Sequence, residues 1–243
     1  MQEKWILLLF VIETMAIAGI IGTWVSKDTR VSFLFGFNVL LPVTFLHVLY
    51  SDGDPARHTL LLAMVGIYQI RMNFILILWY RNTAAAKLKD ILPPAEIYLL
   101  PVLLTNVAGW IYCLPFVWTV DRPGPLDRLD LIVVCVYVLG TIFHFGSDFQ
   151  KHRFKQRPDS YGRVLDTGFW GISRHPNYFG DFLIYIAFGL SAGNFWGFIS
   201  PLANLAQYLG DAIPKSEKMS SERYGKAWED YTQRTKSLIP YIL

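Results

Sequence analysis

The stretch DTGFWGISRHPNYFGDF, residues 166–182, concentrates polar side chains against a long apolar run. A proline follows His175, and proline commonly begins a helix at this position. Asn177, Tyr178 and Asp181 then fall within the first two turns, where spacings of three and four residues make them neighbours. A helix cap and an interfacial aromatic would explain Asn177 and Tyr178, but a carboxylate inside an apolar segment is rare and usually functional. We therefore expect a polar site at this helix start.

A basic segment, SDFQKHRFKQRPDSYGR, precedes this stretch. Lys151 and Lys155 are four residues apart, so they share a face if the preceding helix extends that far. Two cations on one face suit a phosphate group, and Arg163 and Arg174 could add the bidentate contacts that guanidinium groups make with phosphate oxygens. The alternative is a juxtamembrane basic patch attracted to anionic lipid. The segment is therefore a candidate phosphate clamp or a lipid-contacting patch.

The elements that must position these residues are membrane helices. The chain is 53% hydrophobic and 17% charged, with a mean hydropathy of +0.33, which is too apolar for an ordinary soluble domain. A span needs roughly 20 apolar residues, and five such runs cover approximately residues 5–25, 31–50, 59–80, 96–120 and 129–149. The region 176–210, broken at SAGN, fits two shorter spans packed as a hairpin. Backbone groups in lipid must be satisfied within each segment, so we expect an all-α multi-pass transmembrane bundle of about seven spans.

The distribution of Lys and Arg predicts an orientation. Seven crossings place 17 of the 22 Lys and Arg residues in the odd-numbered loops and the C-terminal tail, which puts the 150–175 loop and the tail in the cytoplasm. The membrane is then the endoplasmic reticulum if the source is eukaryotic and the inner membrane if it is bacterial. The first span begins too near the N-terminus for a signal peptide and lacks a clear cleavage site, so we expect it to be retained. Cys113 and Cys135 lack disulfide-framework or metal-ligand spacing, and no metal site is predicted.

Three motifs in order resemble one superfamily of membrane enzymes. The segments SDFQKHRFKQRP, TGFWGISRHPNYFGD and ERYGKAWEDYTQRTKSLIPYIL together resemble the C-terminal half of sterol reductases and of the related steroid 5-alpha-reductases, over about residues 140–243. The resemblance implies a multi-helix enzyme in which NADPH enters from the cytoplasm and reduces a carbon–carbon double bond of a lipid-embedded ring system. There is no GxGxxG motif after a predicted strand, so a Rossmann domain is not expected. We expect one integral membrane domain, with residues 1–128 forming a lipid-substrate chamber and 129–243 holding the cofactor.

The resemblance also implies roles for individual residues. Lys151 and Lys155 match positions near the adenosine phosphates, Tyr224 matches a tail tyrosine that closes the pocket, and Asp148 matches an acidic position at the end of the fifth span. The stretch YQIRMNFILILWYRN adds two arginines from the N-terminal half. The complete set of implied cofactor-binding residues is Arg71, Arg81, Asp148, Lys151, Lys155, Arg163, Arg174, His175, Asn177, Tyr178, Asp181 and Tyr224.

Catalysis would need an acidic group beside the hydride donor. Tyr68 is the candidate, because a phenol polarises a carbonyl without carrying charge in lipid. Steroid 5-alpha-reductases pair such a tyrosine with a glutamate, and Glu13 is the obvious intramembrane carboxylate in this half of the chain; it is equally a candidate for a structural bridge to Arg71. The tail segment DAIPKSEKMSSERYG keeps Lys215 and Glu217 but has less charge than sterol reductases usually show there.

Two other functions fit parts of the pattern. Membrane methyltransferases of the isoprenylcysteine or phospholipid type share an arginine-histidine-proline motif at a helix start, but their cofactor S-adenosylmethionine has no phosphate to match the Lys151 and Lys155 pair. A non-catalytic scaffold with the reductase fold is the second alternative. The partners predicted are a steroid, sterol or other enone lipid substrate and membrane lipids, with no nucleic acid, while the oligomeric state stays open.

Overall fold

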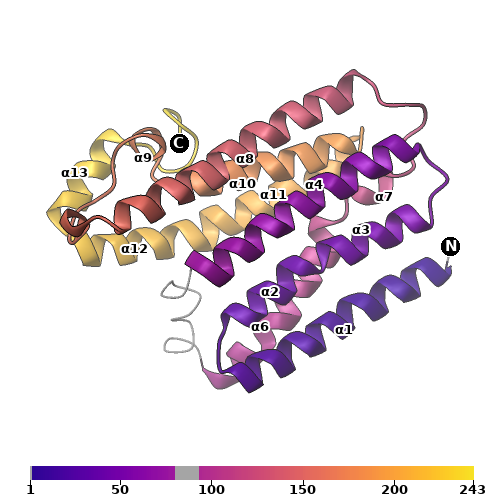
Figure 1. The fold of residues 1–243 in the computed structure, drawn as a ribbon, viewed down its shortest axis with the longest axis horizontal. Helices are drawn as coiled ribbons and strands as arrows, with labels where there is room; N and C mark the ends of the chain where they lie inside the picture. Colours follow the sequence, from indigo (N-terminus) through magenta and orange to yellow (C-terminus); the bar gives the residue numbers. More distant parts are fainter. Residues whose placement is uncertain (1, 80–92) are drawn as a thin grey trace. The chain divides into compact units, whose positions relative to one another are not determined.

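The computed structural model describes residues 2–79 and 93–243, and all regular secondary structure within these ranges is helical (Figure 1). Helical segments long and apolar enough to cross a membrane cover Gln2–Ser26, Arg30–Leu49, Pro55–Leu78, Ala95–Thr119 and Arg128–Lys155. These segments overlap the five runs predicted from the sequence. The protein is therefore an all-α, multi-pass integral membrane protein.

The chain divides into two compact units. The first unit comprises Met1–Asp130 and Gly189–Ser200, and the second comprises Leu131–Phe188 and Pro201–Leu243. The helices of the first unit are α1 (Gln2–Ser26), α2 (Arg30–Asn38), α3 (Leu40–Leu49), α4 (Pro55–Phe74), α6 (Pro94–Asn106) and α7 (Phe116–Thr119), with π-helical turns at Ile75–Trp79 and Val107–Tyr112. The second predicted span is divided between α2 and α3 because Pro42 cannot donate to the Asn38 carbonyl.

Close contacts between small residues and their neighbours hold the first unit together. A Cβ atom added to Gly19 of α1 would lie 2.8 Å from Cβ of Pro101 in α6, and one added to Gly36 of α2 would lie 2.7 Å from Cβ of Leu104. Glycine at these positions lets the helices approach closely, as is common in membrane bundles where packing replaces the hydrophobic effect.

A buried ionic network closes one end of the first unit. Arg57, 1% exposed, places Nη2 3.2 Å from Asp130 Oδ2 and donates from Nη1 to the Arg122 carbonyl at 2.6 Å. Asp54 caps α4 by accepting from the Arg57 backbone N–H at 2.9 Å. Arg122 also forms an ion pair with Asp130. Because buried charges are tolerated when they are paired and hydrogen-bonded, this network fixes the connection between Thr119 and the helix α8 (Arg128–Lys155).

The helices of the second unit carry the motif residues. They are α8 (Arg128–Lys155), α9 (Phe169–Ile172), α10 (Pro176–Ser191), α11 (Ile199–Gln207), α12 (Ile213–Tyr224) and α13 (Lys226–Arg234), with a π-helical turn at Tyr208–Ala212 that joins α11 to α12. The predicted break at SAGN is confirmed, since α10 ends at Ser191 and Gly193 has a φ of +67°. With 16 residues, α10 is roughly 24 Å long, so two further crossings in this region stay a prediction.

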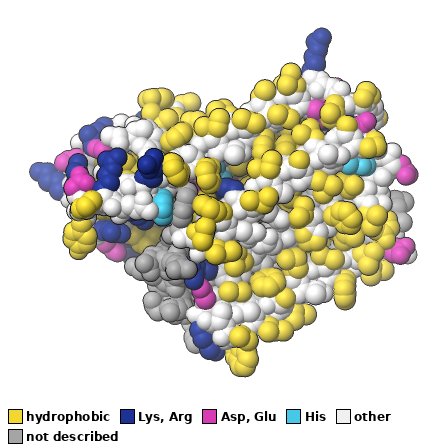
Figure 2. All heavy atoms as spheres, viewed as in Figure 1, with side chains coloured by type: hydrophobic (Ala, Val, Ile, Leu, Met, Phe, Trp, Pro, Cys, Tyr) yellow, Lys and Arg dark blue, Asp and Glu magenta, His cyan; other side chains and the backbone are white. Residues whose placement is uncertain are grey.

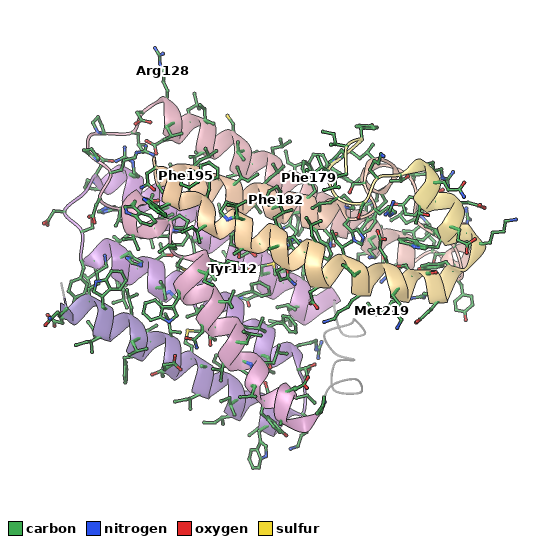
Figure 3. All side chains as sticks on the ribbon, turned by 180° about the vertical axis from the view of Figure 1, so that it is seen from behind. Tyr112, Arg128, Phe179, Phe182, Phe195 and Met219 are labelled. Carbon is green, nitrogen blue, oxygen red and sulfur yellow. The ribbon has the colours of Figure 1, made fainter. Side chains whose placement is uncertain are left out.

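Helices α8 and α10 touch through their backbones. A Cβ atom on Gly180 would lie 2.2 Å from the His144 backbone nitrogen, and one on Gly140 would lie 2.7 Å from the Gly180 carbonyl oxygen. Beside this contact the rings of Phe143 and Phe179 meet edge to face, with centroids 5.1 Å apart; Figure 3 labels Phe179 on α10. The crossing brings the middle of α8 against the first turns of α10.

The surface of each unit separates apolar from charged regions. Figure 2 shows hydrophobic side chains spread along the helices of the first unit, and α1 exposes large ones such as Phe10, Ile17 and Trp24. In the second unit Lys and Arg side chains gather around α9, α12 and α13. Exposed apolar faces of this extent fit a lipid environment, while the charged end of the second unit fits water.

Candidate functional site

The TGFWG segment is fastened to the end of α8. Gln150 donates from Nε2 to the Thr167 carbonyl at 2.8 Å and accepts from the Phe169 backbone N–H at 3.1 Å. Gly168, with a φ of +60°, lies so close to Gln150 that a Cβ atom would meet its amide at 2.4 Å. The Trp170 indole then donates to the Ser147 carbonyl at 3.0 Å. These bonds seat α9 on the last turns of α8.

A group of cations surrounds this seat. Lys151 Nζ lies over the Trp170 ring, 4.4 Å from its centroid, a cation–π contact that holds the ammonium in place. Lys155, four residues further along α8, and Arg223 from α12 are both close enough to interact electrostatically with Lys151. Asp148, which is buried, interacts with both lysines. Three cations against one carboxylate leave a net positive site, which suits a phosphate-bearing ligand.

Beside the cations, one carboxylate oxygen collects several donors. Glu217 Oε1 on α12 accepts from Arg174 Nε at 2.9 Å and Nη2 at 2.8 Å. His175 Nε2 and Ser237 Oγ each lie 3.3 Å from the same oxygen. The arginine and histidine of the SRHPNY motif are thereby joined to α12 and to the tail, three segments that are distant in the sequence. We call these four residues the Glu217 knot.

The charges of the knot follow from its hydrogen bonds. The bond with His175, together with the Arg174 guanidinium, lowers the pKa of Glu217 to about 2. Burial lowers the pKa of His175 against the opposing effect of Glu217, and the Lys151 ammonium lowers it further. At neutral pH we therefore assign an anionic Glu217, a cationic Arg174 and a neutral His175 that donates from Nε2.

The C-terminal tail is bonded to the start of α10. The backbone N–H groups of Arg174 and His175 donate to the carbonyls of Lys236 and Ser237 at 2.8 and 3.0 Å, and Ser173 Oγ donates to the Leu238 carbonyl at 2.8 Å. Tyr231 of α13 donates to the Trp170 carbonyl. Burial raises the pKa of Tyr231, so its hydroxyl stays protonated and able to donate. The amphipathic tail thus covers the motif through backbone bonds.

A row of stacked rings runs from the knot to a buried carboxylate. The His175 and Tyr178 rings are parallel within 4° with centroids 5.3 Å apart, and Tyr178 stacks on Tyr208 at 4.5 Å. Tyr208 donates to Asp181 Oδ2 at 2.6 Å, and Asn204 Nδ2 donates to the same oxygen at 3.2 Å. These contacts pair α10 antiparallel with the helix through α11, and they set a stack of rings beside a buried anion.

The structure unites most of the predicted cofactor residues of the second unit. Lys151, Lys155, Arg174 and His175 belong to the cation group and the knot described above, and Tyr178 and Asp181 form the row of rings with its buried carboxylate. Asn177 is buried in the first turn of α10. Arg163 and Tyr224 lie apart from this group or only at its margin.

Arg163 is exposed and forms an ion pair with Asp159 of its own loop at 2.8 Å. Tyr224 is half-buried at the end of α12, where its ring lies 5.4 Å from the Arg223 guanidinium carbon. Arg81 lies outside the described residues. The assignment of all three to the cofactor remains a prediction.

The predicted catalytic residues belong to the first unit. Tyr68 on α4 is 1% exposed, and its ring meets Phe37 edge to face at 6.5 Å. Arg71, one turn further along α4, is buried and donates to the Met72 sulfur at 2.8 Å. Glu13 is half-buried on α1. Their roles in catalysis remain predictions.

Several residues of the site were not predicted. Trp170 lies in the TGFWG segment and Glu217 in the DAIPKSEKMSSERYG segment, but neither residue type by itself indicated a partner. Arg223 immediately precedes the tail tyrosine, and its position beside a basic loop more than 60 residues earlier requires the fold. His144 and Asn204 carry one available signal, because both are polar residues within predicted apolar spans.

Comparison with known proteins now identifies the family. A family model described as a protein of unknown function, DUF1295, matches residues 19–235. The chain belongs to the DUF1295 family. This DUF1295 protein is 26% identical over 195 residues to the Delta(14)-sterol reductase TM7SF2 of Mus musculus, covering 68% of the chain and 43% of the relative. It is 30% identical over 131 residues to the Delta(14)-sterol reductase erg24 of Schizosaccharomyces pombe, covering 46% and 30%.

These relatives confirm the predicted place of the DUF1295 protein in the sterol reductase superfamily. The chain spans less than half the length of either relative. Among solved structures, the eukaryotic intramembrane Ras methyltransferase ICMT is 18% identical with a TM-score of 0.48, covering 88% of the chain and 75% of that structure.

Proposed function

We propose that this DUF1295 protein is a membrane reductase that uses NADPH to reduce a carbon–carbon double bond of a sterol-like lipid. The observation that carries the proposal is the convergence of Lys151, Lys155 and Arg223 beside the Glu217 knot. The convergence brings together α8, α12 and the SRHPNY motif. Similarity to Delta(14)-sterol reductases supports the reaction class.

The residues present fit a dinucleotide phosphate. Lys151, Lys155 and Arg223 supply positive charge for phosphate groups. This charge is accessible from water, because Lys155 and Arg223 are exposed and Lys151 is half-buried. The stack of Tyr178 and Tyr208 runs from these cations to the buried Asp181 carboxylate. When bound, NADPH supplies the hydride. The protein holds the NADPH molecule, and Tyr68 is the proposed group that donates a proton to the substrate or polarises its conjugated carbonyl.

Binding to detergent-purified protein tests the cofactor. We expect saturable binding of NADPH that is at least tenfold tighter than that of NADH, and a loss of about tenfold or more in Lys151→Ala/Lys155→Ala, because each ammonium removed takes away a charge-assisted contact. Arg163→Ala, in the exposed pair with Asp159, is the matched cation control and should change affinity by less than threefold. Equal binding of NADPH and NADH, or an unaffected double variant, would contradict the proposal.

Turnover tests the reaction. Wild-type protein in lipid nanodiscs is expected to consume NADPH when supplied with a sterol diene or enone lipid, and Tyr68→Phe should lower the rate at least tenfold while leaving the Kd for NADPH unchanged. Saturable S-adenosylmethionine binding without NADPH binding would replace the proposal with methyl transfer. Correctly folded protein that binds neither cofactor would identify a non-catalytic scaffold.

A further inference from the structure

A compact polar cluster lies inside the second unit, between α8, α10 and α11. Asp181 is 4% exposed, Asn204 3% and His144 6%. Asp181 Oδ2 accepts from Asn204 and Tyr208, and Oδ1 lies 3.5 Å from His144 Nδ1. Figure 3 labels Phe179 and Phe182 on the same turns of α10. The cluster is therefore a polar island beside aromatic side chains.

The orientation of the Asn204 amide is determined by its neighbour. Asn204 Nδ2 donates to Asp181 Oδ2 at 3.2 Å, and turning the amide over would place two acceptor oxygens against each other. Its Oδ1 is consequently fixed as an acceptor that faces away from Asp181. Among the described residues this buried oxygen has no hydrogen-bond donor. An acceptor buried in this way destabilises a fold unless another group donates to it.

The position of Asn204 relative to the cations is defined along α8. Lys155 and His144 are eleven residues apart on one continuous helix, or roughly 16 Å. The cation group lies at the Lys155 end and the Asn204 cluster at the His144 end. The row of rings through His175, Tyr178 and Tyr208 connects the two ends. A ligand with phosphates at one end and a flat ring at the other matches this layout.

We propose that Asn204 Oδ1 accepts a hydrogen bond from the carboxamide N–H of the nicotinamide, an inference that rests on the proposed function. A carboxamide supplies the neutral N–H donor that this oxygen needs. The Asp181 carboxylate disfavours an anionic group beside Asn204 and favours a donor. Asn204 is then a binding residue that recognises the carboxamide, and Asp181 with Tyr208 and His144 positions its amide.

The test compares NADPH with its reduced 3-acetylpyridine analogue, in which a methyl group replaces the carboxamide NH2. Wild-type protein should bind NADPH roughly 5- to 10-fold more tightly than the analogue, as expected for one hydrogen bond to a buried acceptor. Asn204→Leu removes the acceptor and should bring the ratio of the two Kd values close to one. Lys151→Ala should weaken both ligands about equally and keep the ratio.

The outcomes separate this inference from the proposed function. A wild-type ratio near one would overturn the role of Asn204 without requiring any variant to fold. A ratio that persists in a folded Asn204→Leu would overturn it as well. If wild-type protein binds neither NADPH nor the analogue, the proposed function itself fails, and this inference fails with it.

Discussion

At Glu217, one carboxylate holds three segments together, and its ionisation gives the site a pH dependence. Its pKa falls from the ordinary 4.5 to about 2 through the bonds with His175 and Arg174, so the unfolded chain binds more protons between these values. The stability that the carboxylate contributes is therefore complete above about pH 4.5 and is lost as the pH falls toward 2.

We expect Glu217→Gln to lower the Tm by roughly 3–8 °C at pH 7, because it weakens charge-assisted bonds to two partners. The difference from wild type should shrink steadily between about pH 4.5 and 2. Tryptophan fluorescence melting of detergent-solubilised protein measures it, with Glu222→Gln, exposed on the same helix, as the control. A difference that is independent of pH in this range would show that the charge of Glu217 is not what holds the knot.

Individual residues differ in how far the sequence could predict them. Lys151 and Lys155 were predictable as a pair, because helical spacing puts them on one face, and Asp181 stood out as a carboxylate in an apolar run. Arg223 and Glu217 were not predictable as partners of the motif. Their contacts depend on how α12 folds back along the second unit, and no local pattern encodes that path.

At the scale of helices, the contact between α8 and α10 positions Asp181 beside His144. We expect Gly180→Ala to destabilise the protein by about 1–3 kcal/mol, because its Cβ would meet backbone atoms at 2.2–2.7 Å, which cannot yield like a flexible side chain. Thermal melting checks the stability, and NADPH binding should weaken with it. Gly66→Ala in α4, where an added Cβ meets nothing within 4 Å, should be neutral or slightly stabilising. Equal melting temperatures for the two variants would argue against a tight crossing.

Helix lengths show where sequence patterns were sufficient. The five long spans and the break at SAGN followed from apolar run length and from Gly and Asn at the break. The apolar run that ends near residue 149 did not reveal that α8 continues to Lys155. In the same way, the apolar region 176–210 did not reveal that helical structure runs from Ile199 through a π-helical turn to Tyr224. Polar residues extend a membrane helix into water without changing its hydrogen bonding, so hydropathy does not register the extension.

For the whole molecule, the distribution of charge predicts one orientation, with the 150–175 loop and the tail in the cytoplasm and the 51–54 loop on the opposite side. Single cysteines at Asp52, Tyr161 and Lys226 test it in a background in which Cys135, the exposed native cysteine, is replaced by serine. In intact bacterial cells that carry the protein in their inner membrane, a membrane-impermeant maleimide should label only Asp52→Cys. After permeabilisation it should also label Tyr161→Cys, whose native side chain is 92% exposed, and Lys226→Cys.

The same experiment decides how the chain crosses between α10 and α12. Labelling of Tyr161→Cys and Lys226→Cys from the same side requires an even number of crossings between them, which α10 and the helix from Ile199 onward would provide as a hairpin. Labelling of Tyr161→Cys and Lys226→Cys from opposite sides would mean a single crossing between them. The tail and the 150–175 loop would then face opposite sides of the membrane. That result would be incompatible with the backbone bonds from Arg174 and His175 to the tail, because residues joined by those bonds must share one side of the membrane.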